Sequence, residues 1–358
     1  MNNYHLIESV WYSQSKLNWL LWPFSLPFLL MVKLKRFLYQ SEIISSHRFN
    51  TPVLVIGNIS VGGTGKTPFI NQLIRMLADE GIKAGVVSRG YLGSISRYPH
   101  QVRETDSVEQ IGDEAFMQFL DLNVKDKLNI PMVIDPSRSN AVNHLLRSDD
   151  VDIVISDDGM QHYKMSRDIE VLLFDGKRQF GNRLILPFGP LREPVSRLET
   201  VQLVVQNGLS NIDKNCSDID VRKNQITPHN VYLHARSVVN LKTRQEFPVD
   251  KFLQQKVVAV AGVGNPDRFF ESLSAVCQLE VKKVFPDHHS FKMEDFESFG
   301  DEIIVMTEKD AAKCYEFAED NWYYLKVDML FNDILCDKIL ELVNSSIKKR
   351  KENRKVNE

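Results

Sequence analysis

The stretch VLVIGNISVGGTGKTPFINQLIRML, residues 53–77, decides the fold. It begins with a short β-branched run typical of a buried strand, continues into a glycine-rich turn, and ends with apolar residues at helical spacing. A strand, a glycine-rich turn closing on Lys-Thr and a helix are the parts of a phosphate-binding loop. The strict pattern G-x-x-x-x-G-K-[ST] places a glycine at position 60, where this chain has Ser60. The flanking context favours a true nucleotide site over a glycine turn that resembles one by chance.

The residue types inside this turn suit a triphosphate. Glycines let the backbone wrap close to phosphate oxygens without Cβ clashes. Lys66 and Thr67 stand at the start of the expected helix, where backbone N–H groups and the helix dipole favour anions. Ser60 can donate its hydroxyl or its N–H where the usual glycine turns. The predicted nucleotide-binding residues are Ser60, Val61, Gly62, Gly63, Thr64, Gly65, Lys66 and Thr67.

A second apolar strand, VDIVISDDG (residues 151–159), delivers two adjacent carboxylates, Asp157 and Asp158, at its end. P-loop enzymes place a metal-organising carboxylate at this position. Two neighbouring carboxylates repel each other unless a cation lies nearby, and Mg²⁺ held by Thr67 and one of these aspartates meets that need. Asp-Asp-Gly is also good turn chemistry, so a solvated turn is the alternative. Together with the loop, the pair predicts a Mg-ATP or Mg-GTP site.

From about residue 51, strand patterns alternate with helix patterns, which predicts an α/β fold. We expect a mostly parallel sheet of the P-loop NTPase type with helices on both faces. Past about residue 200 the sequence becomes polar and turn-rich before further strand–helix units follow, which indicates a smaller second α/β domain with a ligand cleft between the two. The expected parts are an N-terminal apolar helical segment (1–40), a P-loop kinase core (41–215), a second domain closing the cleft (216–345) and a basic tail (346–358).

The composition is that of an ordinary globular chain. With 358 residues, 43% hydrophobic and 25% charged, it can bury a full core. The net charge of -3 gives no reason to expect nucleic acid as a partner, and no protein partner is indicated. The four cysteines, Cys216, Cys277, Cys314 and Cys336, are widely spaced, so neither a zinc site nor a disulfide framework is expected.

The N-terminal stretch LNWLLWPFSLPFLLMV (17–32) is nearly all apolar, and a basic cluster (Lys33, Lys35 and Arg36) follows it. A helix that spans a membrane needs about 20 apolar residues. This stretch is shorter, and two prolines interrupt it. We predict a segment lying in the membrane interface, with tryptophans at headgroup depth and lysines facing anionic lipid. The alternative is an apolar helix packed on the chain's own core. The C-terminal KKRKENRK (348–355) is expected to be a solvated tail that adds weak attraction to lipid.

A series of short motifs extends along the chain in a fixed order. They are GNISVGGTGKTP, SRGY (88–91), GDE (112–114), DDGMQH (157–162), LPFGPLREP (186–194), GVGNPDRF (262–269), DHH (287–289) and TEKDA (307–311). Together, across roughly residues 10–330, they resemble the tetraacyldisaccharide 4'-kinases of lipid A biosynthesis. That family carries a small hydroxylated residue where the strict loop has its first glycine, so Ser60 is normal there. Leu92, where the family commonly has glycine, and Met160, for a usual leucine, depart from its pattern without touching an expected reacting group.

The resemblance implies an activity and a place in the cell. The family transfers the γ-phosphoryl group of ATP to the 4'-hydroxyl of a membrane-embedded, acylated glucosamine disaccharide 1-phosphate, with Mg²⁺ as cofactor. The product is the 1,4'-bisphosphorylated lipid A precursor. The resemblance further implies a monotopic enzyme on the cytoplasmic face of the bacterial inner membrane, which gives the apolar N-terminal segment a purpose. Preference for ATP over GTP also comes from the resemblance, since no guanine-reading N-K-x-D is obvious.

The transfer needs a group that accepts the proton of the sugar hydroxyl, because that hydroxyl is a poor nucleophile near neutral pH. Asp113, between the loop and the strand ending in two aspartates, is the candidate base. Carrying the family's Asp–His pair onto this chain joins Asp113 to His288, with His289 less favoured. Such a pair is completed only as the cleft closes, which suppresses wasteful hydrolysis of ATP. The alternatives are a helix N-cap for Asp113 and a surface turn for His288.

Further roles follow for charged residues of the motifs. Lys66 and Asp158 are expected to be catalytic, with Lys66 bridging the β- and γ-phosphates. Either Asp157 or Asp158 is expected to contact the metal, and Glu114 to reach the metal or its waters. The expected substrate-binding residues are Arg89, Gln161, His162 and Arg192. The two arginines match phosphate oxygens, although structural salt bridges explain either equally well, and the Gln-His pair either lines the sugar side or orients Asp158. GVGNP lacks a following lysine and is expected to be a turn in a domain core.

Two other interpretations stay open at this point. A membrane-associated P-loop switch or partitioning ATPase explains the loop, the acidic strand and the apolar N-terminus, but leaves Asp113, LPFGPLREP and DHH without a purpose. A cytosolic small-molecule kinase explains the site, with the N-terminal segment packed internally.

Overall fold

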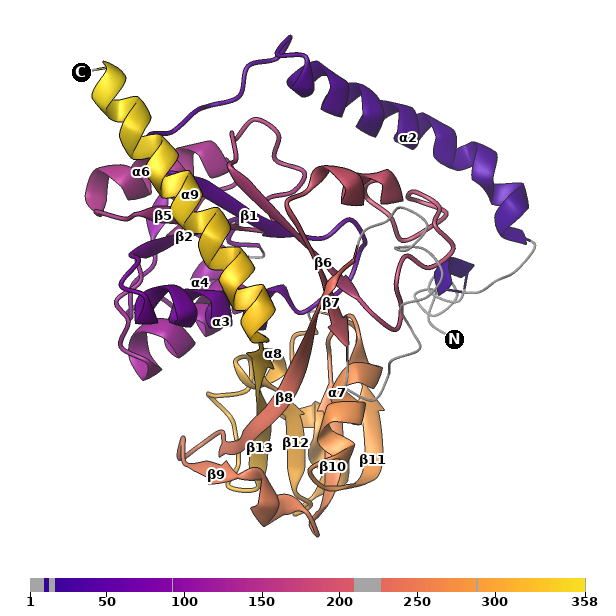
Figure 1. The fold of residues 1–358 in the computed structure, drawn as a ribbon. Coiled ribbons are helices and arrows are strands. Elements are labelled where there is room, and N and C mark those ends of the chain that lie inside the picture. The colour runs from indigo at the N-terminus through magenta and orange to yellow at the C-terminus, as the bar shows by residue number, and fades with distance from the viewer. Residues whose placement is uncertain (1–9, 13–16, 92, 209–226, 288, 358) are drawn as a thin grey trace.

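A computed structural model describes residues 10–12, 17–91, 93–208, 227–287 and 289–357. In this part of the chain one mixed sheet of 13 strands runs through the whole molecule, in the order β11-β10-β12-β13-β8-β7-β6-β1-β5-β2-β4-β3, with β9 paired to β8 (Figure 1). Most neighbouring pairs are parallel, and helices cover the sheet. The α/β fold with a mostly parallel sheet is therefore confirmed.

The first half of the sheet has the doubly wound arrangement expected of a P-loop protein. Its central strand β1 pairs in parallel with β5 on one side and β6 on the other. The strands are β1 (Val53–Gly57), β2 (Ala84–Ser88), β3 (His100–Gln101), β4 (Met132–Ile134), β5 (Ile153–Asp157), β6 (Ile169–Asp175) and β7 (Leu203–Gly208). The helices are α3 (Lys66–Asp79), α4 (Val108–Ile111), α5 (Asp113–Phe119), η1 (Leu120–Lys125), α6 (Arg138–Ser148) and η2 (Val195–Thr200).

Alternate residues of β1 enter different cores, as the pleat of a strand requires. Leu54 and Ile56 pack against α3, whereas Val53 and Val55 pack on the opposite face with α6. Helix α3 buries the residues that its helical spacing predicts, Phe69, Leu73, Ile74 and Leu77. The first core therefore holds the helix that begins at the phosphate loop rigidly against the sheet.

The second half of the sheet carries the smaller unit, drawn in orange in Figure 1. Two long antiparallel strands, β8 (His229–Asn240) and β13 (Trp322–Leu330), connect it to the first half. The other strands are β9 (Glu246–Pro248), β10 (Lys256–Ala261), β11 (Gln278–Val284) and β12 (Ile304–Thr307). Its helices are η4 (Val249–Phe252), α7 (Pro266–Ser274), η5 (Met293–Asp295), η6 (Glu297–Phe299) and α8 (Glu308–Ala311). It has cores of its own on both faces.

The pairing of β8 with β13 reverses the direction of the sheet between the halves. Strand β8 runs parallel to β7, and β13 runs antiparallel to β8, so β10, β11 and β12 point opposite to β1 and β5. The turns that follow β10, β11 and β12 line the same cleft as the turn that follows β1. Ligands of α/β sheets bind at the carboxyl ends of strands, and here two sets of carboxyl ends face each other.

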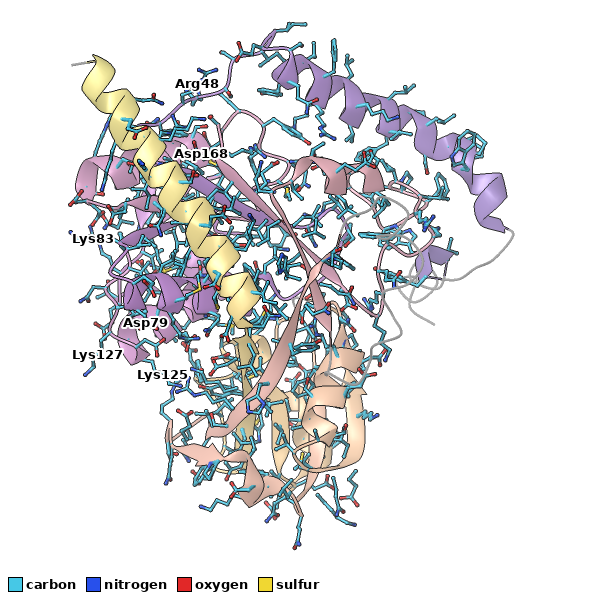
Figure 2. All side chains as sticks on the ribbon, viewed as in Figure 1. Arg48, Asp79, Lys83, Lys125, Lys127 and Asp168 are labelled. Carbon is cyan, nitrogen blue, oxygen red and sulfur yellow. The ribbon has the colours of Figure 1, made fainter. Side chains whose placement is uncertain are left out.

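Helix α9 (Asp333–Asn357) returns from the second unit to the first, crossing the P-loop half in yellow in Figure 1. Leu335, Ile339 and Val343 join the core that contains α3. Arg350 forms an ion pair with Asp168 at 2.7 Å beside the C-terminal part of this helix (Figure 2). The described part of the expected basic tail over 346–358 is helical, and it exposes Lys348, Lys349 and Lys351 to solvent. The domain boundaries stay predictions, but the last helix packs with the first unit.

Helix α2 (Leu17–Gln40) runs through both prolines of the apolar N-terminal stretch and lies along the periphery (Figure 1). Phe28 and Leu29 pack on the first unit, and the Ser25 hydroxyl donates to the Ile185 carbonyl at 2.8 Å. Leu30 and Leu34 of the same helix are exposed, at 64% and 58% accessible. Among the described helices, none combines the length and apolarity needed to cross a bilayer. The segment therefore both packs on the protein and presents apolar side chains outward.

Candidate active site

A cleft of about 1030 Å³ lies where the two units and α2 meet. Residues 61–68 of the phosphate loop form its floor, α2 contributes Phe28, Met31 and Lys35, and the second unit contributes residues 263–265, 287 and 307–309. The position at the carboxyl ends of both strand sets agrees with the ligand cleft expected between the units.

The loop after β1 has the backbone that a phosphate cradle needs. Gly62 and Gly65 have φ of 107° and 86°, in the left-handed region that favours glycine. A Cβ at Gly65 would lie 2.2 Å from Asn207 Nδ2, which itself donates to the Thr64 carbonyl at 2.9 Å. Helix α3 begins directly afterwards at Lys66. The N–H groups of its first turn therefore open into the cleft, where an anion is stabilised.

Ser60, at the position of the missing glycine, is buried and pairs through its backbone with Leu191. On either side of it, Val61 N–H donates to the Pro190 carbonyl at 2.8 Å and Arg192 N–H donates to the Ile59 carbonyl at 2.6 Å. The opening of the loop is thus fastened to the LPFGPLREP segment. This pairing explains how Arg192, distant in sequence, is brought to the phosphate loop.

The two aspartates at the end of β5 differ in environment. Asp158, with φ of 46°, has its carboxylate 3.4 Å from Lys66 Nζ and 3.1 Å from Arg192 Nη1. Burial acts to raise its pKa, but these two cations outweigh burial and lower the pKa of Asp158 to about 2. Burial and the charge of Glu114 instead raise the pKa of Asp157 to about 7. Two adjacent carboxylates with such different proton affinities indicate a site built around further charge.

The residues present fit a divalent cation shared with phosphate oxygens. Asp157 Oδ1 and Asp158 Oδ1 are buried and accept no hydrogen bond, and Thr67 lines the same cleft. Within the described ranges, no group of three or more His, Cys, Asp or Glu side chains is gathered for a metal. A Mg²⁺ ion here would therefore depend on nucleotide oxygens and waters to complete its shell, which is how Mg²⁺ is usually bound.

Asp113 is the first residue of α5 and is 5% exposed. The N-cap of that helix is Gly112, so the alternative interpretation of Asp113 as an N-cap is wrong. Its Oδ1 accepts the Glu114 N–H at 2.9 Å, and its Oδ2 lies 3.7 Å and 3.8 Å from Lys309 and Lys313 Nζ. The buried carboxylate of Asp113 therefore faces two ammonium groups of the second unit.

His288 lies outside the described residues, so its pairing with Asp113 stays a prediction. The neighbouring His289 faces its own unit, with Nε2 2.9 Å from Asp295 Oδ2. Its ring stacks on Phe285 and contacts the edge of Phe291. These contacts hold His289 within the second unit.

The predicted substrate-binding residues line the cleft near α2, and they divide into two groups. Arg192 belongs to the phosphate side, since it pairs with Asp158. Gln161 donates to Glu193 Oε1 at 2.8 Å, and its carbonyl accepts Lys35 Nζ at 3.2 Å. Burial, with nearby arginines, lowers the pKa of His162 to about 4. Arg89 and His162 line the cleft as well.

Three contributors escaped the sequence analysis. Buried Arg138 donates to the Asp157 carbonyl at 2.8 Å, and buried Glu193 accepts the Tyr163 hydroxyl at 2.5 Å. The third is Lys309. Arg138 follows the carboxyl end of strand β4, and this position could have identified it as a candidate. Glu193 and Lys309 lie inside the motifs LPFGPLREP and TEKDA, but the sequence analysis assigned neither of them a role.

The GVGNP turn is more than part of a domain core. Gly262 N–H donates to Asp310 inside the second unit at 2.8 Å. Two residues later, a Cβ at Gly264 would lie 3.5 Å from Gly63 N and 3.2 Å from Asp287 Oδ2. The turn therefore closes directly over the phosphate loop, and the core-only expectation is wrong in that respect.

Comparisons with known proteins give a consistent result. Residues 17–344 match the family model described as tetraacyldisaccharide-1-P 4'-kinase. A tetraacyldisaccharide 4'-kinase of Legionella pneumophila (strain Lens) is 40% identical over 331 residues, covering 91% of this chain and 94% of the relative. One of Haemophilus influenzae (strain 86-028NP) is 42% identical over 320 residues, covering 89% and 90%. The crystal structure of LpxK from Aquifex aeolicus in complex with ATP is similar with a TM-score of 0.72 and 25% identity, covering 91% of this chain and 99% of that one.

Proposed function

Because this chain belongs to the tetraacyldisaccharide-1-P 4'-kinase family, we propose residue roles for the reaction of that family. The protein is an ATP-dependent kinase that phosphorylates the 4'-hydroxyl of tetraacyldisaccharide 1-phosphate in lipid A synthesis. The switch ATPase is not favoured. One observation supports the residue roles above all: the phosphate loop, the aspartate pair of β5, Glu114 next to buried Asp113, and residues of α2 line one cleft.

The nucleotide side of the cleft is formed by residues 60–67. Lys66 bridges the β- and γ-phosphates, and the N–H groups at the start of α3 bind their oxygens. Mg²⁺ held by Thr67 and the Asp157–Asp158 pair, with Glu114 toward its waters, would neutralise charge on the transferring group. Arg192 is the second cation at the γ-phosphate, because its guanidinium group lies next to Asp158.

The acceptor side is formed by α5, by the segments that follow β2 and β5, and by α2. Asp113 takes the proton of the 4'-hydroxyl, and His288 completes the pair from the second unit. Arg89, Gln161 and His162 bind the sugar and its phosphate. The low pKa of His162 keeps this imidazole neutral at physiological pH, so it offers a hydrogen bond without charge.

This assignment is tested by transfer from γ-labelled ATP to purified, detergent-dispersed tetraacyldisaccharide 1-phosphate. The expected product is a lipid labelled at the 4'-position, formed with Mg²⁺ and reduced by about 100-fold or more when EDTA removes it. Consumption of ATP without labelled lipid would favour the switch ATPase, and undiminished transfer in EDTA would contradict the metal site.

We further propose that this kinase works on a membrane surface, where the acyl chains of its substrate stay in the bilayer, and the exposed residues of α2 support this proposal. Trp22, Phe24, Leu34 and Phe37 are exposed along this helix, and the basic cluster at residues 33–36 lies among them. Apolar side chains beside lysines suit anionic headgroups. We place the enzyme on the inner leaflet, facing the cytoplasm, as a monotopic protein.

Replacing Phe24, Leu34 and Phe37 by serine should weaken binding to anionic vesicles by about tenfold or more, because each substitution removes apolar surface that the membrane would bury. Co-sedimentation with phosphatidylglycerol-containing vesicles measures the binding. The control is Leu253→Ser, since Leu253 is similarly exposed but lies on the second unit. Equal loss in both variants, or none in the triple variant, would count against the membrane role of α2.

A further inference from the structure

A cation from the second unit reaches the candidate base of the first. Lys309 Nζ lies 3.7 Å from Asp113 Oδ2 and 3.3 Å from Glu114 Oε1, both on α5. On its other side it lies 3.9 Å from Asp287 Oδ1, which follows β11. One side chain thus joins both units at the reacting end of the cleft.

Lys309 is presented from a rigid platform. It lies in the short helix α8, whose N-cap is Thr307, and Asp310 beside it is fully buried. The Asp310 carboxylate accepts the Thr307 hydroxyl at 2.7 Å and the Gly262 N–H at 2.8 Å. Asp310 therefore ties the TEKDA motif to the GVGNP turn that covers the phosphate loop. Because both are fixed together, the second unit carries Lys309 to the cleft in one defined position.

The contacts of Asp113 show why that position matters. Its Oδ1 is held by a backbone N–H of its own helix, while its Oδ2 faces the ammonium groups of Lys309 and Lys313, both from the second unit. A base works when it is fixed within hydrogen-bond reach of the acceptor hydroxyl, and a displacement of about 1 Å can cost about 100-fold in rate. The orientation of this carboxylate hence depends on docking of the second unit.

We propose that Lys309 is a positioning residue for phosphoryl transfer: docked from the second unit between Asp113, Glu114 and Asp287, it fixes the carboxylate of Asp113 toward the sugar hydroxyl. The inference rests on the proposed role of Asp113 as the base. It gives the TEKDA motif a function, and it makes the base competent only while the cleft is closed.

The test replaces Lys309 by methionine, which keeps the length and removes the charge. We expect kcat for lipid phosphorylation to fall by about 100-fold, with the Kd for ATP, measured by calorimetry without lipid, within about threefold of the parent value. Lys309→Arg restores a charge to the same carboxylates, so it should recover kcat to within about tenfold of the parent protein. A purely structural role would lower the melting temperature and would not separate kcat from ATP affinity.

The matched control is Lys177→Met. Lys177 also forms an ion pair across the units, with Glu271 of α7, but this pair is exposed to solvent and lies away from Asp113. The kcat of the Lys177→Met variant should stay within about twofold of the parent value. Should Lys309→Met fail to fold, Lys309→Gln replaces it with the same expectation. Parent-like kcat in the charge-free variant, or an equal loss in Lys177→Met, overturns the inference. If the parent protein itself forms no 4'-phosphorylated lipid, the proposed function fails instead.

Discussion

Lys66→Ala should lower kcat/KM for phosphorylation of the lipid by about 1,000-fold or more, the largest loss we expect from one side chain. Phosphoryl transfer depends on neutralising charge on the phosphates in a fixed geometry, and Lys66 stands at the first turn of α3 with its ammonium 3.4 Å from Asp158. Removing it takes away the cation that we propose to bridge the β- and γ-phosphates. Steady-state transfer from γ-labelled ATP measures the loss.

The matched control for this variant is Lys83→Ala. Lys83, labelled in Figure 2, pairs with Asp150 on the solvent-exposed side of the first unit, and such surface pairs contribute little. Its activity should be that of the parent. The Lys66 variant should keep its fold, since Arg192 remains beside Asp158. Activity within tenfold of the parent in Lys66→Ala would remove the phosphate loop from the mechanism.

The phosphate site could be predicted because its signals are local and topological. The loop needs only a strand, glycines and a helix in succession, all inside residues 53–77. Asp157 and Asp158 join it because β5 pairs with β1 in parallel, so that their carboxyl ends meet at one edge. Asp113 comes from a helix between these strands. A parallel sheet makes such gathering of distant residues predictable from strand endings alone.

What could not be predicted depends on contacts between the units. Nothing in the order of strands along the sequence shows that β13 runs antiparallel to β8, and that pairing is what turns the GVGNP and TEKDA segments toward the loop. The approach of Gly264 to Gly63 and of Lys309 to Asp113 follows from it. Helix α9 likewise returns to the first core through long-range packing, which composition cannot reveal.

Asp113→Asn tests the proposed base, and it should lower kcat by about 100- to 10,000-fold. The amide keeps the size of the carboxylate, so the buried position at the start of α5 stays filled, but it cannot accept a proton from the sugar hydroxyl. ATP does not depend on that proton transfer for binding. The Kd for ATP should therefore stay within about threefold of the parent value, measured by calorimetry beside the transfer assay.

Glu109→Gln is the control for this substitution, because Glu109 is an exposed acid on the adjacent α4 and should leave kcat unchanged. A loss of ATP binding equal to the loss of kcat in Asp113→Asn would place the carboxylate on the nucleotide instead of the acceptor. Retained kcat would show that the hydroxyl loses its proton to another group or to the departing phosphate. The predicted outcome is a fall in kcat at constant ATP affinity, and it requires that Asp113 acts on the acceptor hydroxyl. The two lysines of the second unit, Lys309 and Lys313, contact Asp113 at this position.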